Sequence, residues 1–341
     1  MKKVLLWLTA AALFAAGVVL VFFPAVTSWT SGRESREEIE RFQRENGRVE
    51  QETGTDAEET GTDAEETGDA ETGETQETGG TDGGEKSALL EEMRDYNSRI
   101  YQEHQTSLKD AWSFEENIFD LQSLGIQDDM AGYITIEAMD LQLPLYIGAT
   151  EENMQKGAAV LGQTSMPVGG ENTNCVIAAH RGYRGVPMFR EIERLQPGDL
   201  VQVTNFWGTI NYRVVKSIVV NPDEIEAIKI MEGQDLVTLV SCHPYTENYL
   251  RYIVYCVRDD TGEEEAESGD ERQASGETAG GGSLTAEDIP FEGVPYVSSE
   301  SAIREEQMVN RAARYLFAGL LVLLLAVLIV RGFRKRKGKR R

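Results

Sequence analysis

Three cysteines and three histidines are the residues of this 341-residue chain best suited to nucleophilic or metal chemistry. A cysteine thiolate is a strong nucleophile, and a nearby imidazole can lower the thiol pKa and later protonate a departing amine. Zinc sites need closely spaced ligand pairs such as C-x-x-C or H-x-x-x-H, and the sequence offers no such pair. We therefore expect thiol chemistry without a metal or other cofactor. The six residues are Cys175, Cys242, Cys256, His104, His180 and His243.

Cys242 is the strongest candidate nucleophile. It ends the apolar run Leu236–Cys242, and His243-Pro244 follows at once. Because proline cannot extend a central strand, the thiol should lie at a rim that a substrate can reach. Taken alone, a cysteine at the end of an apolar strand is more often a small buried hydrophobe.

Two other strand ends carry groups that suit the same chemistry. His180 closes the run Asn174–His180, and Arg251 opens the run that follows Cys242. A nucleophile, an acid/base and a fixed cation, each at a strand end, can converge on one mouth of a barrel. Arg251 keeps its proton, so it can hold a substrate and oppose charge that develops on a carbonyl oxygen. The combination predicts acyl transfer.

The other histidines and cysteines have simpler interpretations. Neighbours on a strand point to opposite faces, so His243 should face away from the Cys242 thiol and is the weaker candidate for the base. His104 is expected to be a solvated surface residue. Cys175 and Cys256 lie inside strands and are expected to be packed thiols, although a bridge between them stays open.

Short strands must position these groups. A helix is expected over Ala88–Ser107, where apolar residues recur at three- and four-residue spacing. After Gly132, short runs rich in β-branched and aromatic residues alternate with turn signals, which predicts a mainly β sandwich or closed barrel with one short helix near Met188–Leu195. The expected strands are Tyr133–Ile136, Leu143–Ile147, Asn174–Ala179, Leu200–Thr204, Thr209–Val220, Leu236–Cys242 and Tyr249–Val257.

Negative charge is concentrated in two stretches. The chain has 33 Lys+Arg against 58 Asp+Glu, and Glu50–Lys86 and Asp259–Gly281 hold most of the excess. An acidic chain does not favour nucleic acid as a partner. The first stretch repeats Glu52–Glu58 without a large apolar side chain, so we expect a disordered stalk and not a coiled coil, which needs an apolar seam. The second stretch, Asp259–Gly281, is expected to be a similar disordered spacer.

Two apolar segments predict a membrane protein. Val4–Val26 follows two lysines, and Tyr315–Val330 precedes a basic tail. About 20 residues span a bilayer core. The first segment exceeds the usual signal-peptide length of about 7–15 apolar residues, which favours an uncleaved anchor over a cleaved signal peptide. The flanking basic residues place both termini in the cytoplasm and the domain between the segments outside the cell membrane.

Several short motifs occur together between Tyr133 and Arg258. They are Thr238-Leu-Val-Ser-Cys242; Ala179-His180-Arg181-Gly182; Leu161–Asn172; Met188-Phe189; Leu195–Asp199; and the position of Arg251. With these motifs the stretch resembles the sortases, the cysteine transpeptidases of Gram-positive cell surfaces, and is most similar to the class C branch that builds pili; the first motif is similar to the family's TLxTC and the second to its GHRG. The resemblance implies a closed eight-stranded β-barrel, with Cys242 as nucleophile, His180 as general acid/base and Arg251 as stabiliser.

Ahead of the barrel, Asp110-Ala111-Trp112 resembles the class C lid, which usually reads Asp-Pro-aromatic. Such a plug can work if Asp110 pairs with Arg251 while Trp112 covers the thiol. Ala111 replaces the usual proline, which should make the loop less rigid. The alternative is that Trp112 only packs the N-terminal helix onto the barrel.

The motif residues around the candidate nucleophile are further candidates for contact with the substrate. Thr238, Ser241 and Arg181 belong to the two motifs that carry Cys242 and His180. Ser241 stands where threonine is common in the family, so recognition of the sorting motif is the property that the resemblance transfers least.

The resemblance implies cleavage of an LPxTG-like sorting signal through a thioacyl enzyme and transfer to an amine, which in class C enzymes is a pilin lysine. The partners are then sorting-signal proteins and the bilayer. The alternatives are a sortase that attaches single proteins to peptidoglycan and a catalytically silent binding domain. The predicted organisation is an anchor at 1–26, a disordered acidic stalk at 27–87, an N-terminal helix and lid at 88–132, the barrel at 133–258, an acidic spacer at 259–314, a transmembrane helix at 315–333 and a basic tail at 334–341.

Overall fold

The computed structural model describes residues 32–46, 82–114, 119, 121, 126, 129–183, 186–260 and 284–338. One unit, Arg33–Tyr183 with Pro187–Tyr296, contains the β-barrel, and a separate unit contains the long C-terminal helix. A helix spans 32–46. The other elements are α2 (Asp82–Gln102), η1 (Ala111–Ser113), β1 (Met130–Ile136), η3 (Glu137–Met139), β2 (Leu141–Ile147), α3 (Glu151–Lys156), β3 (Ala158–Val160), β4 (Thr173–Ala178), η4 (Met188–Arg194), β5 (Leu200–Asn205), β6 (Gly208–Val220), η5 (Ile225–Ile228), β7 (Asp235–His243), β8 (Leu250–Arg258) and α5 (Glu300–Gly338).

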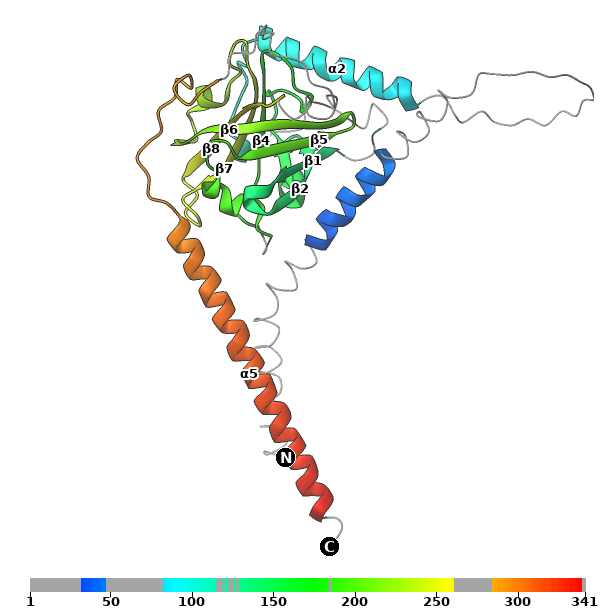
Figure 1. The fold of residues 1–341 in the computed structure, drawn as a ribbon, viewed down its shortest axis with the longest axis vertical. Helices are drawn as coiled ribbons and strands as arrows, with labels where there is room; N and C mark the ends of the chain where they lie inside the picture. The colour runs from blue at the N-terminus through cyan, green and yellow to red at the C-terminus, as the bar shows by residue number, and fades with distance from the viewer. Residues whose placement is uncertain are drawn as a thin grey trace, which may run out of the picture. The chain divides into compact units, whose positions relative to one another are not determined.

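The strands form a closed barrel in the order β1-β2-β3-β4-β7-β8-β6-β5, which confirms the predicted eight-stranded fold (Figure 1). The pairs β2/β3 and β4/β7 are parallel, and the other strand pairs are antiparallel. Each of the seven predicted strands is present, and the eighth, β3, has only three residues. A run of three residues is too short to show the alternation that identifies a strand.

Burial along the strands explains why some were easier to identify than others. β5 alternates buried and half-buried residues, as expected for a strand with one solvated face. β4 is buried at every position and β7 at all but its first, so neither strand has a solvated face. The ends of these two covered strands carry His180 and Cys242, so the candidate groups start from a rigid, close-packed wall.

α2 packs one apolar face on the barrel. Leu89, Met93, Tyr96 and Ile100 are at most 4% exposed and recur at three- and four-residue spacing. The buried amide of Asn97, on the same helix, accepts from Met166 N at 2.7 Å and donates to Met166 O at 3.5 Å. This helix begins at Asp82, six residues before the predicted start at Ala88, and it leads the chain toward η1.

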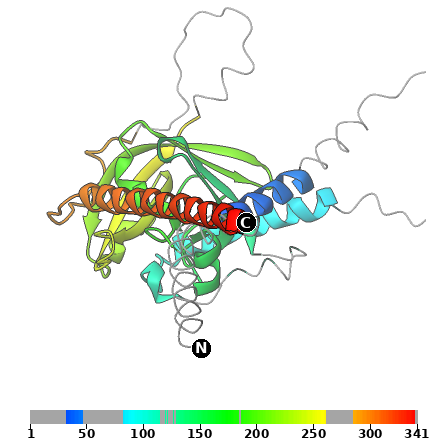
Figure 2. The same cartoon turned by 90° about the horizontal axis from the view of Figure 1, so that it is seen from below.

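The helix over 32–46 falls within the segment that was predicted to be a stalk, but it belongs to the folded unit. Ile39 and Phe42 are 2% and 7% exposed and cluster with Met130 and Tyr146 of the barrel. At its end, Asn46 Oδ1 accepts from Lys86 Nζ of α2 at 3.1 Å. Figure 2 shows this helix next to α2. The chain therefore contacts the barrel on both sides of residues 47–81, which lie outside the described residues.

Residues 284–296, which we call the strap, also pack on the barrel beyond the predicted limit at Arg258. Leu284 and Ile289 are buried in the core cluster. Val294 N donates to Val219 O at 2.7 Å, and Lys216 Nζ donates to Ile289 O at 3.0 Å. The strap thus lies along β6 beyond Arg213, the last residue of β6 that pairs with β5.

The predicted transmembrane helix at 315–333 falls within α5, which spans Glu300–Gly338. In the part of the chain that the structure describes, no helix combines the length and the apolar character that a bilayer crossing requires. The predicted anchor at 1–26 lies outside the described residues.

Candidate active site

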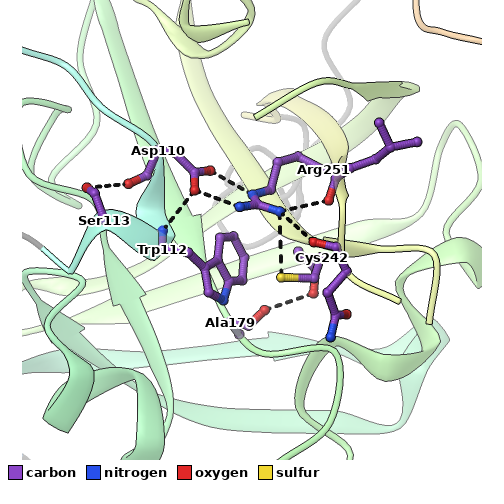
Figure 3. A network of polar contacts seen from close by, with 9 residues as sticks. Asp110, Trp112, Ser113, Ala179, Cys242 and Arg251 are labelled. Atoms are coloured by element: carbon purple, nitrogen blue, oxygen red, sulfur yellow. Dashed lines mark hydrogen bonds and ion pairs between the residues drawn. The ribbon is translucent and has the colours of Figure 1, made fainter. Parts of the chain in front are cut away.

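Strand register brings Cys242 and Arg251 together. They are direct Cα partners in the antiparallel β7/β8 ladder, near the end of one strand and the start of the next. Arg251 Nη1 lies 3.9 Å from Cys242 Sγ (Figure 3). The same nitrogen donates to Leu250 O at 2.9 Å and to Asn248 O at 3.2 Å, which fixes the guanidinium beside the thiol. The geometry places a permanent positive charge against the candidate nucleophile.

The environment of Cys242 keeps its thiol protonated. Only 6% of the residue is exposed, and burial raises the thiol pKa to about 12, against the lowering effect of Arg251. Asp110 adds to the increase because its negative charge opposes a thiolate. A thiol is a weak nucleophile and the thiolate is the reactive form, so this arrangement is a resting one.

Asp110 and Trp112 occupy the space in front of Arg251. The two Asp110 carboxylate oxygens accept from Arg251 Nε and Nη2, each at 2.7 Å, in a bidentate pair (Figure 3). The Trp112 indole lies over the guanidinium, with its centroid 4.5 Å from Cζ. Asp110 also caps η1 by accepting from Trp112 N at 3.2 Å. One short segment therefore engages Arg251 through charge and through an aromatic face.

Little open space remains beside Asp110 and Arg251. The pocket beside Asp110 and Arg251 has a volume of about 20 Å³, and its lining includes Val240 and Ile253. This volume holds about one water molecule. Ala111 is 2% exposed and belongs to the same apolar cluster, so its methyl group contributes to the filling. A pocket of this size is too small to hold a peptide side chain.

His180 lies two residues beyond the end of β4, between two aromatic rings. The Trp112 ring meets it edge-on at 6.3 Å, and the Tyr183 ring stacks on it at 5.0 Å with an interplanar angle of 17°. Burial lowers the His180 pKa, which favours a neutral imidazole. The same tryptophan thus contacts both His180 and Arg251, the partner of Cys242. Sequence reasoning did not identify Tyr183, because a loop tyrosine carries no periodic signal.

The other predicted contact residues have partners within the protein. Thr238 is fully buried and its Oγ1 donates to Asn174 Oδ1 at 2.8 Å. Ser241 is also fully buried and donates to Ala179 O at 2.8 Å. Arg181 is 4% exposed, and its guanidinium donates to Cys242 O. All three join neighbouring segments of the barrel wall, and their contact with a substrate stays a prediction.

The remaining histidines and cysteines lie as the strand pattern indicates. His243 is fully buried, and its Nδ1 lies 3.3 Å from Glu193 and not at the thiol. His104 is exposed in the turn after α2. Cys175 and Cys256 are free, and burial raises the pKa of both thiols, which makes them unreactive. No bridge joins them. Among the described residues, no His, Cys, Asp and Glu cluster has the geometry of a metal site.

Comparison with known proteins agrees with this arrangement. The sortase domain family model matches residues 134–259, which is the barrel from β1 to the end of β8. Sortase A of Bacillus anthracis is 26% identical over 156 residues, covering 45% of this chain and 72% of that protein. Sortase D of Bacillus subtilis is 25% identical over 130 residues, covering 37% of this chain and 62% of that protein.

Solved structures include sortase C from Clostridium perfringens SM101, which is 34% identical, with coverage of 52% of this chain and 90% of that one and a TM-score of 0.44. Sortase C1 of Streptococcus agalactiae is 32% identical, with coverage of 52% and 92% and a TM-score of 0.48. Because the family model extends over the barrel and its candidate groups, and curated sortases are similar to the chain, residues 134–259 form a domain of the sortase family of cysteine transpeptidases.

Proposed function

We propose that Cys242 cleaves an LPxTG-like sorting signal at the Thr–Gly bond and transfers the threonyl group to an amine. The observation that carries this proposal is the contact between Cys242 Sγ and the Arg251 guanidinium beneath a segment that fills the groove. In the reaction the thiolate attacks the threonine carbonyl carbon, and the glycine amine leaves. The resulting thioester is then attacked by the acceptor amine, which restores the thiol.

Arg251 and His180 have different roles in this sequence of steps. Arg251 holds the substrate carbonyl and stabilises the negative charge of the tetrahedral intermediate, as fixed donors do in other acyl transfers. His180 accepts the thiol proton and donates it to the departing glycine amine. The apolar lining of the pocket, which includes Leu161, Val240 and Ile253, suits the leucine and proline of the signal.

Asp110 and Trp112 act as a lid that substrate must displace. The bidentate carboxylate of Asp110 occupies the Arg251 donors that a substrate carbonyl would use. With the lid closed, the raised Cys242 pKa and the lowered His180 pKa favour a neutral thiol and a neutral imidazole. Opening the lid admits water and removes the negative charge, so both changes favour the thiolate.

The acceptor amine is proposed to be a pilin lysine, which yields an isopeptide-linked polymer. The lid segment and the motif resemblance to the class C branch support this choice over attachment of single proteins to peptidoglycan. A polymer-forming enzyme acts outside the cell membrane, and the apolar runs at 1–26 and 315–333 with their basic flanks support a two-pass membrane location. Confinement of enzyme and membrane-tethered substrate would raise their effective concentration.

The test uses the full-length chain, because the strap and the helix over 32–46 belong to the folded unit. The purified protein is incubated with a peptide that contains Leu-Pro-Glu-Thr-Gly, and mass spectrometry searches for a threonyl thioester on Cys242. The adduct should be absent in Cys242→Ala. An adduct on another residue, or unchanged cleavage by Cys242→Ala, would overturn the proposal. Laddered products with a lysine-bearing pilin domain distinguish polymerisation from attachment to a peptidoglycan amine.

A further inference from the structure

A second group of polar side chains lies behind Cys242, on the side of β7 to which His243 points. Its members come from four parts of the chain, namely the loop after β4, η4, the β7/β8 hairpin and the strap. We call this group the rear network. It consists of Arg181, Glu193, His243, Tyr252 and Tyr296.

Arg181 is the centre of the rear network. Its Nη2 donates to Glu193 Oε1 at 2.5 Å and its Nε donates to Arg190 O at 2.9 Å. Its Nη1 donates to the backbone oxygen of Cys242 at 3.1 Å. The Arg181 and Glu193 side chains are only 2% and 10% exposed. A guanidinium whose three nitrogens are all engaged in a fixed fork has no freedom to reach a substrate.

The strap closes the rear network from outside. The Tyr296 ring meets the His243 ring edge-on at 4.9 Å and the Tyr252 ring at 5.9 Å. His243 is fully buried, and its Nδ1 lies 3.3 Å from Glu193 Oε1. Exclusion of water strengthens the ion pair and its hydrogen bonds, because the local dielectric is low.

The hydrogen bond from Arg181 to Cys242 O links the chain after β4 to β7 at a point where the two strands are no longer paired in the sheet. The parallel β4/β7 pairing ends at Ala178 and Val240, and Ala179 N donates to Val240 O at 3.2 Å. Ser241 adds one hydrogen bond to Ala179 O. Beyond this point the two strand ends separate, and the residues that follow are His180 on one and Cys242 on the other.

We propose that Arg181 is a positioning residue that fixes the Cys242 backbone relative to His180, and that Glu193 holds Arg181 in this orientation. Arg181 is bonded covalently to His180, so its hydrogen bond to Cys242 O ties the two strand ends at the level of the reacting groups. The inference rests on the proposed roles of Cys242 and His180. Transfer of a proton between groups on different strands requires this connection, since displacement of about 1 Å can slow a reaction about 100-fold.

The test measures transpeptidation of the Leu-Pro-Glu-Thr-Gly peptide by Arg181→Lys in the full-length chain. Lysine keeps the positive charge but cannot bridge Glu193, Arg190 O and Cys242 O together. We expect kcat to fall by about 10- to 100-fold while KM stays within about twofold, because geometry and not substrate binding is lost. The matched control is Arg258→Lys, which removes an arginine paired with Asp260 at the far end of β8.

Arg258→Lys should keep kcat within about twofold of the wild-type value, as expected of a position away from the site. If Arg181→Lys folds poorly, Glu193→Gln gives a second reading, since the amide keeps an acceptor oxygen but loses the charge. It should lower kcat by about 3- to 10-fold, the loss of part of a charged hydrogen bond. Wild-type kcat in both variants, with Cys242→Ala inactive, would overturn the positioning role alone. Activity in Cys242→Ala would instead overturn the proposed function.

Discussion

Two arginine–carboxylate pairs lie on either side of Cys242, and they differ in burial and in what holds them. In front, Arg251 pairs with Asp110, whose side chain is 21% exposed. Behind, Arg181 pairs with Glu193, whose side chain is 10% exposed, and it also bonds Arg190 O and Cys242 O. Breaking a buried pair by removing one partner is more destabilising than breaking a more exposed one, because the charge that is left cannot be solvated.

The comparison separates two functions that one kind of interaction can serve. The front pair joins the barrel to a short segment whose carboxylate a substrate can replace. The rear pair joins strand ends of the barrel wall, where loss of one partner leaves a buried charge without compensation. We therefore expect changes to the front pair to alter access and reactivity, and changes to the rear pair to alter the geometry of the reacting groups.

The largest expected effect comes from Arg251 itself, because it belongs to the lid contact and to the proposed reaction. Arg251→Lys should lower kcat/KM for the Leu-Pro-Glu-Thr-Gly peptide by about 10²- to 10³-fold, the typical effect of removing one donor to an oxyanion. Steady-state kinetics measure this change. A variant with a looser lid and undiminished turnover would show that Arg251 serves only to hold the lid.

The control is Arg213→Lys, which changes an arginine paired with Asp259 at 2.6 Å on an exposed part of the barrel. Its kcat/KM should stay within about twofold of the wild-type value, because surface substitutions rarely change more than about 0.5 kcal/mol. The difference in kcat/KM between the two variants shows whether the loss of activity depends on the location of Arg251 or follows from any arginine-to-lysine change in the barrel.

The next effect is on the reactivity of the thiol. Asp110→Ala removes the carboxylate that raises the Cys242 pKa and frees the lid, so the pKa should fall from about 12. A lower pKa gives more thiolate at neutral pH, and each unit raises that fraction about tenfold. We expect alkylation by iodoacetamide to become about 10- to 100-fold faster. The pH at which the rate is half-maximal should move downward.

Glu224→Ala is the matched control for this change. Glu224 lines the same pocket and carries the same charge, but Asp110 and not Glu224 pairs with Arg251. If only Asp110→Ala is alkylated faster, the ion pair between Asp110 and Arg251 is the cause. Equal alkylation rates in the two variants would mean that the loss of any nearby negative charge is sufficient and that Asp110 does not hold a lid.

A third change acts on the wall behind the nucleophile. A side chain at Gly293 of the strap would place Cβ 2.9 Å from Val219 N and 3.0 Å from Val219 O. Gly293→Val should displace the strap and lower the free energy of unfolding by about 1–3 kcal/mol, as overpacking does. Thermal unfolding should shift by about 2–4 °C per kcal/mol for a domain of this size.

Glu292→Val tests whether added volume alone has this effect, since residue 292 is exposed. It should leave the melting temperature nearly unchanged. If Gly293→Val also melts at the wild-type temperature, packing of the strap on β6 contributes no stability, and the strap does not cover the rear network.

Strand alternation predicts a mainly β sandwich or closed barrel, and the resemblance to the sortases selects the closed eight-stranded barrel that the structure has. The strand-end positions indicate where Cys242, His180 and Arg251 lie. The pairing of Cys242 with Arg251 depends on the register across the β7/β8 hairpin, which the sequence pattern alone does not determine. β3 was missed because three residues show no period. Local sequence pattern therefore predicts where the strands lie, whereas the register between paired strands depends on tertiary contacts.

The segments outside the barrel were the least predictable. The helix over 32–46 is highly charged, and only contact with the barrel reveals that Ile39 and Phe42 are core residues. The strap has no regular structure, so no periodicity could identify it. Arg181 was assigned to the substrate groove from its place beside His180, but its direction is set by Glu193, a partner twelve residues away on η4. Long-range partners of this kind are not visible in a local motif.

The smallest expected effect tests whether the lid can be made more rigid. Ala111 is the first residue of η1, where proline is well tolerated, and Asp110 before it has φ −62° and ψ 142°, the conformation that proline favours in its predecessor. Ala111→Pro should therefore stabilise the closed lid by about 0.4–1 kcal/mol through the entropy of the open segment. Alkylation of Cys242 should slow by about two- to fivefold in Ala111→Pro. The control is Ser113→Pro, which would remove the hydrogen bond from Ser113 N to Asp110 O and should make alkylation of Cys242 faster. Faster alkylation of Cys242 in Ala111→Pro would mean that proline at residue 111 does not stabilise the pairing of Asp110 with Arg251.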